Sequence, residues 1–415
     1  MTSIQPSAPA PAGVPHRVHR KDLQDLRGLS RRPFLSFLQK QAQPLVPRSR
    51  EEAATPVQYP KLAAFMSQRV WKWISEYWRF RIGPKHPFPS YDGSDTGIHR
   101  MPGDEIRIAL AGDWGTGTDE AALVADRIAD FEPHYSIHLG DVYYVGDPAE
   151  VRANFLGVAN PGTQYAPCKW PEGSVGTFAL NGNHEMYARG YGYFDLILPA
   201  MGLRGGGGQP ASYFCLENDH WRIIALDTGY NSIGLPVLEN IVTPDCRLPP
   251  PLIDWLREKV QPRADDARGI VLLSHHQYYS RFDDCFPKPA QQLAEFFSRP
   301  VLWLWGHEHR LAIYHEAGMP GGIRAFGRCI GHGGMPVDLP SAKRHDYTVE
   351  FADARVYPND ENLHIGFNGF VQMTLHGNAL HLAYVDLNGA RVFDEAWAVR
   401  NGALTRVHAA AMQAK

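Results

Sequence analysis

Short apolar runs separated by helical stretches fill the central part of this 415-residue chain, and they constrain its fold more than any other feature. Apolar runs of this kind favour buried β-strands, and their alternation with helices favours an α/β layout. The predicted strands cover residues 106–111, 135–139, 177–180, 222–226, 270–273 and 301–305. Ligands of open α/β sheets bind outside the carboxyl ends of the strands, so the residues after each run are the first candidates for function.

Five of these six runs end in residue types that bind metal ions. The endings are Gly112-Asp113-Trp114-Gly115, Gly140-Asp141-Val142-Tyr143-Tyr144, Gly182-Asn183-His184-Glu185, Ser274-His275-His276 and Gly306-His307-Glu308-His309. Carboxylate, amide and imidazole donors without thiolates suit Mn, Fe or Zn. The central carboxylate of Asp141 can bridge two ions, and such a pair stabilises the attacking and leaving oxygens of a phosphoryl displacement. The sequence therefore predicts a dinuclear metal site.

In this order the motifs resemble those of the calcineurin-like metallophosphoesterase superfamily, over about residues 106 to 310. Most of that superfamily has a histidine two residues after the first aspartate, where this chain has Gly115, and the second motif here supplies Tyr144. This exchange places the chain nearer the purple acid phosphatases. The resemblance implies an α/β fold, namely a four-layer α/β/β/α metallophosphoesterase sandwich of two packed mixed sheets flanked by helices.

The resemblance also implies a set of metal ligands. One ion would be held by Asp113, Asp141, Tyr144 and His309, and the other by Asp141, Asn183, His275 and His307. A phenolate ligand favours a ferric ion in the first site, and the second would take Fe, Zn or Mn. His276 stays open as the alternative to His275, because Gln277 replaces a proline of the family pattern. Tyr143 is expected to pack in the core.

The activity implied by the resemblance is hydrolysis of a small phosphate ester, as in acid phosphatases. A metal-activated water would attack phosphorus, with Asp141 bridging the ions and His184 protonating the leaving oxygen. Glu185 and His276 are expected to orient ligands or contact substrate, and Arg189 either contacts phosphate or is solvated. Two alternatives stay open: a phosphodiesterase, including one for cyclic nucleotides, and a non-catalytic, membrane-associated binding protein on the same fold.

Four segments are expected along the chain. Residues 1–60 hold nine of the 33 prolines and form an extended or disordered arm. Residues 61–100 contain an aromatic, basic helix over 61–81 and a linker, which we expect to pack on the catalytic domain rather than in a membrane. The catalytic domain covers 101–400, and 401–415 form a tail. Within the domain, residues 369–376, 379–386 and 391–397 alternate as strands joined by hairpins and are expected to complete a second sheet.

The charge and the cysteine content of the chain indicate which partners and which cellular compartment to expect. Lys plus Arg number 41 against 44 Asp plus Glu, so no positive excess attracts nucleic acid. Five cysteines without C-x-x-C spacing argue against a disulfide framework and favour a cytoplasmic location. Ser30-Arg31-Arg32-Pro33-Phe34-Leu35 resembles a twin-arginine signal, but Gln39-Lys40-Gln41 interrupts the apolar stretch that should follow. Periplasmic export is therefore the alternative location.

Overall fold

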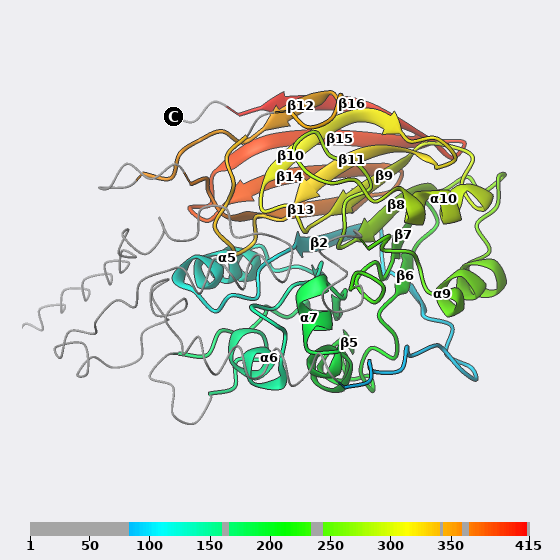
Figure 1. The fold of residues 1–415 in the computed structure, drawn as a ribbon. Coiled ribbons are helices and arrows are strands. Elements are labelled where there is room, and N and C mark those ends of the chain that lie inside the picture. Colours follow the sequence, from blue (N-terminus) through cyan, green and yellow to red (C-terminus); the bar gives the residue numbers. More distant parts are fainter. Residues whose placement is uncertain (1–82, 160–165, 234–243, 341–342, 359–364, 413–415) are drawn as a thin grey trace, which may run out of the picture.

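The computed structural model describes residues 83–159, 166–233, 244–340, 343–358 and 365–412. The expected arm at 1–60 and the expected helix at 61–81 lie outside the described residues. Within these ranges the structure forms two eight-stranded mixed sheets. This architecture confirms the predicted sandwich of two packed sheets with flanking helices (Figure 1).

The first sheet has the strand order β16-β15-β14-β13-β2-β3-β4-β5. Its strands are β2 (Glu105–Ala111), β3 (Tyr135–His138), β4 (Gly176–Ala179), β5 (Gly202–Leu203), β13 (Gly369–His376), β14 (Ala379–Asp386), β15 (Arg391–Arg400) and β16 (Ala403–Ala411). β2, β3 and β4 run parallel, whereas β13 to β16 form an antiparallel meander that joins at β2. The three predicted C-terminal strands thus extend the sheet of β2 instead of completing the other one.

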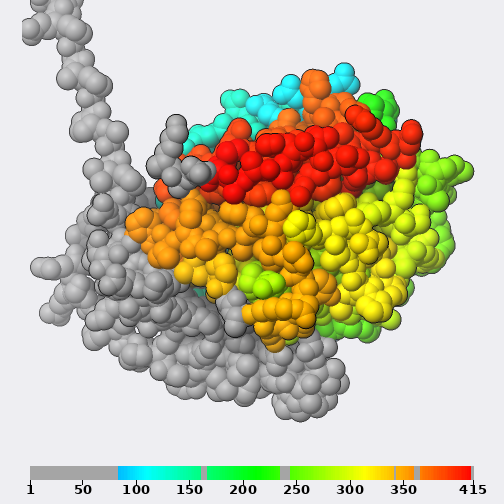
Figure 2. All heavy atoms as spheres, turned by 90° about the horizontal axis from the view of Figure 1, so that it is seen from above, coloured from blue at the N-terminus to red at the C-terminus, as the bar shows by residue number. Residues whose placement is uncertain are grey.

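The second sheet has the order β1-β6-β7-β8-β9-β11-β10-β12. Its strands are β1 (Ile98–Arg100), β6 (Phe214–Glu217), β7 (Trp221–Ala225), β8 (Gly269–Ser274), β9 (Val301–Trp305), β10 (Leu311–Gly318), β11 (Arg324–Ile330) and β12 (Val349–Ala352). β7, β8, β9 and β11 are parallel, so their carboxyl ends meet at one edge. β1 shows that residues before 101 already belong to the domain, and β16 lies within the expected tail at 401–415. Figure 2 shows the C-terminal residues, in red, on one face of the molecule.

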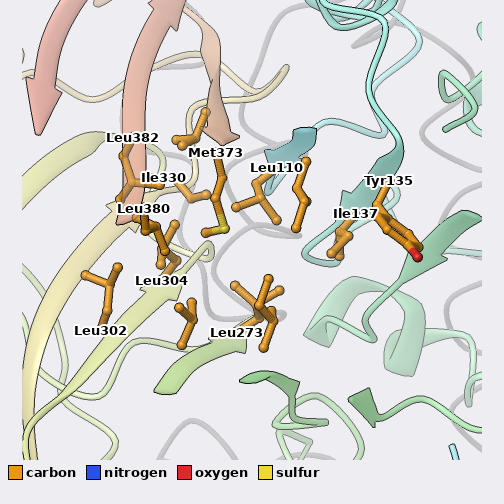
Figure 3. Close-up of a cluster of buried hydrophobic side chains, with 14 of the residues drawn as sticks. Leu110, Tyr135, Ile137, Leu273, Leu302, Leu304, Ile330, Met373, Leu380 and Leu382 are labelled. Atoms are coloured by element: carbon orange, nitrogen blue, oxygen red, sulfur yellow. The ribbon is translucent and has the colours of Figure 1, made fainter. Parts of the chain in front are cut away.

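The alternation of side chains along each strand produces the layers. Ile106, Ile108 and Leu110 of β2 point into the core between the sheets, while Ala109 and Ala111 point to the opposite face. The inner core also receives Leu273, Leu304 and Met373, as Figure 3 shows. Figure 1 shows α5 and α6 on one side of the molecule and α9 and α10 on the other, so helices flank the two packed sheets.

The helices covering the first sheet are α5 (Asp119–Asp130), α6 (Pro148–Asn154), α7 (Asn183–Tyr187), η2 (Tyr193–Ile197) and α8 (Leu198–Ala200), and those covering the second are α9 (Pro250–Trp255), η3 (Leu256–Val260), α10 (Pro287–Gln292) and η4 (Leu293–Glu295). The Thr118 hydroxyl accepts from the backbone of Ala121 and caps α5, and the Asp147 carboxylate caps α6. No helix among the described residues is long and apolar enough to cross a membrane.

One ion pair joins the two sheets through the core. The guanidinium of Arg328 on β11 donates to both carboxylate oxygens of Glu395 on β15, at 2.6 and 2.7 Å. Both side chains are fully buried, and the Tyr384 hydroxyl donates a further hydrogen bond to Glu395 (2.7 Å). Because removal of one partner would leave an unpaired buried charge, the pair strongly couples the two layers.

Candidate metal centre

The predicted ligand residues lie at the carboxyl ends of strands from both sheets. Asp113, Asp141 and Asn183 follow β2, β3 and β4 of the first sheet, and His275 and His307 follow β8 and β9 of the second. All are buried. Asp113, Asp141 and His307 have φ values of 60, 76 and 66°, a region that favours glycine. Such backbone outliers concentrate at functional sites, which supports a role for these turns.

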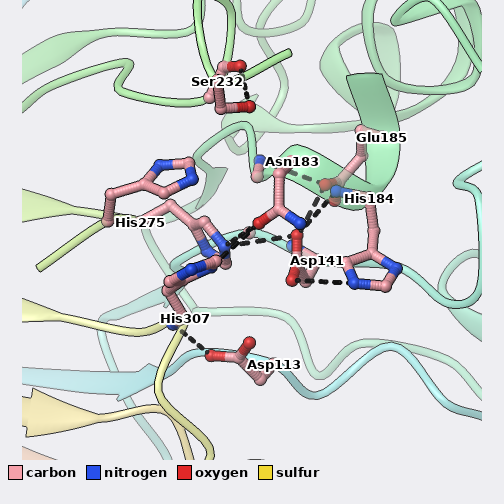
Figure 4. A network of polar contacts seen from close by, with 12 residues as sticks. Asp113, Asp141, Asn183, His184, Glu185, Ser232, His275 and His307 are labelled. Atoms are coloured by element: carbon pink, nitrogen blue, oxygen red, sulfur yellow. Dashed lines mark hydrogen bonds and ion pairs between the residues drawn. The ribbon is translucent and has the colours of Figure 1, made fainter. Parts of the chain in front are cut away.

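One group of side chains gathers around the amide oxygen of Asn183 (Figure 4). That oxygen lies 3.0 Å from Nε2 of His275 and 2.9 Å from Nδ1 of His307. Nε2 of His275 is also 3.3 Å from Oδ1 of Asp141. The amide nitrogen of Asn183 donates to the Tyr187 hydroxyl (2.7 Å), which leaves the oxygen directed at the histidines. The structure thus brings together the four residues expected at the second ion.

A second group gathers around Asp113. Nε2 of His309 lies 3.5 Å from Oδ1 of Asp113. The Tyr143 hydroxyl donates to Oδ1 of Asp113 (2.8 Å) and to Oδ2 of Asp141 (3.2 Å), and it lies 3.1 Å from Nε2 of His309. The phenol beside Asp113 and His309 is therefore that of Tyr143. The family resemblance implied Tyr144 as the ligand, and Tyr143 was expected to pack in the core.

The backbone after β3 explains which tyrosine faces the centre. Val142 forms a parallel bridge with Gly115, because the Gly115 N–H donates to the Asp141 carbonyl (3.3 Å) and the Tyr143 N–H to the Gly115 carbonyl (3.0 Å). In extended backbone, side chains two residues apart along the chain face the same side, so the Tyr143 side chain lies on the same side as that of Asp141. Burial and the Glu150 carboxylate raise the pKa of the Tyr144 hydroxyl well above its usual value.

The charges of this cluster suit a bound cation. Asp113 and Asp141 are buried, and among the described residues only histidines form ion pairs with them. Although burial opposes ionisation, His275 and His184 hold the pKa of the Asp141 carboxyl well below its usual value. Asp113, Asp141 and His275 bring donor atoms within 4.8 Å of one another, as do His275, His276 and His307. Buried carboxylates, imidazoles and an amide oxygen fit hard or borderline divalent and trivalent ions.

Neighbouring groups orient the predicted ligands. The Nδ1–H of His275 donates to the Leu139 carbonyl (2.9 Å), which directs Nε2 at the centre. His276 also lies in the cluster, but its Nδ1 is 3.1 Å from the Thr228 hydroxyl. Oε2 of Glu185 accepts from the backbone N–H groups of Asp141 (3.1 Å) and Gly182 (3.0 Å) and so ties two ligand-bearing turns together.

His184 lies on the opposite side of Asp141 from His275 (Figure 4). Its Nδ1–H donates to the Tyr144 carbonyl (2.6 Å), and its Nε2 is 3.8 Å from Oδ2 of Asp141. Burial lowers the pKa of the His184 ring. Nε2 of His184 therefore lies beside the Asp141 carboxylate but farther from it than Nε2 of His275, which is 3.3 Å from Oδ1. Arg189, the last predicted contact residue, is half-buried, and its carbonyl accepts from the His86 N–H (2.9 Å).

Two residues that support the centre, Asp227 and Thr228, were not predicted from the sequence, because no ligand was expected after the fourth predicted strand. Asp227 and Thr228 follow β7, at the same sheet edge as the ligands. The Asp227 carboxylate accepts from the Tyr230 N–H (2.7 Å), and burial raises the pKa of Asp227 to about 6. Thr228 accepts from the His276 N–H (2.9 Å). Their position directly after an apolar run was the signal that could have identified them.

Several solved structures and one family model are similar to parts of this chain. GAP50, the anchor in the inner membrane complex of Plasmodium, is 16% identical (72% of this chain, 89% of that chain, TM-score 0.43). PhoD is 13% identical (80% and 74%, TM-score 0.42), and vacuolar protein sorting 29 from Cryptosporidium parvum is 11% identical (75% and 100%, TM-score 0.27). No curated protein matches the chain. Residues 106–311 match the model of the calcineurin-like phosphoesterase family, so this part of the chain is similar to a calcineurin-like phosphoesterase domain. The described part of this region contains buried His/Asp groups that could hold a metal ion.

Proposed function

We propose that this protein is a dinuclear metal-dependent hydrolase of small phosphate esters, similar in activity and metal content to the purple acid phosphatases. The observation that carries the proposal is the convergence of two buried carboxylates, the Asn183 amide oxygen, three histidines and one phenol where the carboxyl ends of strands from both sheets meet. The match of residues 106–311 to the calcineurin-like phosphoesterase family supports phosphoester chemistry. The convergence of the predicted ligands supports two ions.

The side chains that would hold the ions divide into two sets sharing Asp141. Asp113, His309 and the Tyr143 phenol would serve one ion, and Asn183, His275 and His307 the other. When bound, the ions would neutralise phosphoryl oxygens and lower the pKa of an attacking water. A phenolate ligand favours ferric iron in the first set, with Fe, Zn or Mn in the second.

The chain itself would supply proton transfer and orientation. Because Nδ1 of His184 is bound to the Tyr144 carbonyl, its Nε2 is the nitrogen able to protonate a leaving oxygen. Glu185 would hold the Asp141 and Asn183 turns in place through Oε2. His276, restrained by Thr228, would orient its neighbours or contact substrate.

The test is turnover of an aryl phosphate monoester and the matching diester between pH 5 and 9, with metal-replete protein. We expect a monoester preference at acidic pH, and Asp141→Asn should lose both metal and activity. The exposed Asp104→Asn is the matched control, because Asp104 precedes the amino end of β2, whereas Asp113 follows the carboxyl end. Retention of metal and full turnover by Asp141→Asn would remove the bridging role.

The same assay separates the alternatives. A diester preference would make the protein a phosphodiesterase, and bound metal without turnover of either ester would favour a non-catalytic binding protein. We further propose a cytoplasmic location from the cysteine content. Recovery of the protein in a periplasmic fraction would contradict that location.

A further inference from the structure

Lys85 occupies a half-buried position close to the metal-centre loops. Its ammonium donates to the Tyr230 carbonyl (2.7 Å) and lies 3.8 Å from the centre of the Tyr230 ring. An ammonium has three N–H donors, and no carboxylate among the described residues forms an ion pair with this one. Lys85 therefore retains donor capacity for another oxygen.

Two arginines, Arg189 and Arg247, lie near enough to Lys85 for their charges to lower its pKa. The Arg189 backbone is joined to the neighbouring His86 (N–H to carbonyl, 2.9 Å), and the Arg247 carbonyl accepts from the Asn231 amide (2.8 Å). Burial lowers the pKa of Lys85 to about 8, and Arg189 and Arg247 act in the same direction against the attraction of Asp227. Arg247 pairs with Asp245 at 3.3 Å. Lys85, Arg189 and Arg247, the cationic cluster below, thus concentrate positive charge.

The cationic cluster lies next to the Asn183 side of the centre. Tyr230 follows Gly229, where a Cβ atom would lie 2.3 Å from the Asn181 carbonyl oxygen and 2.8 Å from that of Gly182. The loop carrying Tyr230 therefore packs directly against the turn before Asn183. Arg189 is linked to the same turn along the chain, since it follows α7, which begins at Asn183.

We propose that the cationic cluster binds an anionic oxygen group, a phosphate or carboxylate, beside the metal centre. Two sources share this chemistry: a second anionic group on the ester being hydrolysed, or a free anion. The first source rests on the proposed function. Charge-assisted hydrogen bonds from ammonium and guanidinium groups are the strongest that side chains offer to such oxygens, so the selectivity gained should be measurable.

The kinetic test compares phenyl phosphate with analogues that carry a phosphonate on alkyl spacers of one to three carbons. We expect the wild-type protein to prefer a phosphonate-bearing ester, and Lys85→Met to reduce this preference, as a ratio of kcat/KM values, by about tenfold. Arg247→Gln should reduce it less; its exposed side chain makes a folding defect a poor explanation. The exposed Lys259→Met is the matched control and should preserve the ratio.

A binding test does not require turnover. Acylation of Lys85 at pH 8, followed by peptide mass spectrometry, should be slowed by methylenebisphosphonate. Protection by inorganic phosphate at similar concentration would identify a free anion, and protection by the bisphosphonate alone a second substrate group. An unchanged kinetic ratio in Lys85→Met together with no protection by either anion would overturn the inference. Absent turnover with protection intact would instead count against the proposed hydrolase only.

Discussion

The hydroxyl of Tyr143 lies 2.8 Å from Oδ1 of Asp113, although the two residues are 30 positions apart. The same hydroxyl reaches Asp141 and His309, so one phenol contacts both carboxylates of the candidate centre. Burial, reinforced by Asp113 and Asp141, raises the pKa of this hydroxyl well above its usual value. The phenol would therefore ionise only with a cation beside it, which makes it a sensitive reporter of the bound metal.

Replacement of Tyr143 by Phe should weaken metal binding by about 10- to 100-fold, because a group directed at Asp113 and Asp141 is lost. If ferric iron is bound, its visible charge-transfer band should also disappear. Metal analysis and absorption spectra provide the measurement. Tyr144→Phe is the matched control and should keep both properties; loss of the band in Tyr144→Phe instead would restore Tyr144 as the ligand.

Replacement of His184 by Ala should lower kcat by about 10²- to 10⁴-fold while both ions are retained, since His184 is assigned to proton transfer. The measurement is kcat together with metal content. The exposed His220→Ala serves as the control. A wild-type kcat in His184→Ala would exclude the proposed proton donor, and loss of metal would make His184 a ligand.

Gly182→Ala should disrupt the centre although it replaces no ligand residue. A Cβ at this position would lie 2.1 Å from Oδ1 of Asp141, so the carboxylate must move. We expect metal content to fall at least about tenfold, with activity falling alongside. Gly207→Ala is a matched control, because a Cβ there meets nothing within 4 Å. Equal metal content in the two variants would show that Asp141 tolerates displacement.

Glu120 should make stability depend on pH. Burial raises the pKa of this carboxyl in the first turn of α5 from 4.5 to about 7. Because the folded state favours the protonated form, the associated stability is complete below about pH 4.5 and is lost as the pH rises through 7. The loss approaches about 3 kcal/mol.

Glu120→Gln should remove this dependence and unfold at higher denaturant concentration than the wild type at pH 8. Urea unfolding at pH 5 and pH 8 measures the effect, with the exposed Glu105→Gln as control. Equal destabilisation of Glu120→Gln at both pH values would mean that the carboxyl is ionised in the folded protein.

Local patterns predicted much of the fold. β13 and β14 begin and end where hairpin turns and alternation placed them, and β9 coincides with its apolar run. The pairing of β13 with β2 was not predictable, because it joins segments more than 250 residues apart and no local signal specifies the partner. β16 was missed since its largely exposed residues lack an apolar face.

The candidate centre was predictable as far as it depends on strand ends. Turns after β2, β3, β4, β8 and β9 meet because parallel strands in packed sheets bring their carboxyl ends together. Spacing alone could not decide between adjacent tyrosines, since that choice depends on the bridge of Val142 with Gly115. Asp227 was not predicted because the fourth apolar run is not followed by one of the family's ligand motifs. Its carboxylate accepts a hydrogen bond from the Tyr230 backbone.

The candidate ligands come from strand ends of both sheets: Asp113, Asp141, Tyr143 and Asn183 from the first, and the three histidines from the second. Ions bound there would connect the two layers as the Arg328–Glu395 pair does deeper in the core. Occupancy and unfolding are then linked equilibria, because ions that bind only the folded chain add RT ln(1 + [L]/Kd) to its stability. Chelation would consequently shift the thermal unfolding midpoint, and the protein's persistence would follow the availability of metal.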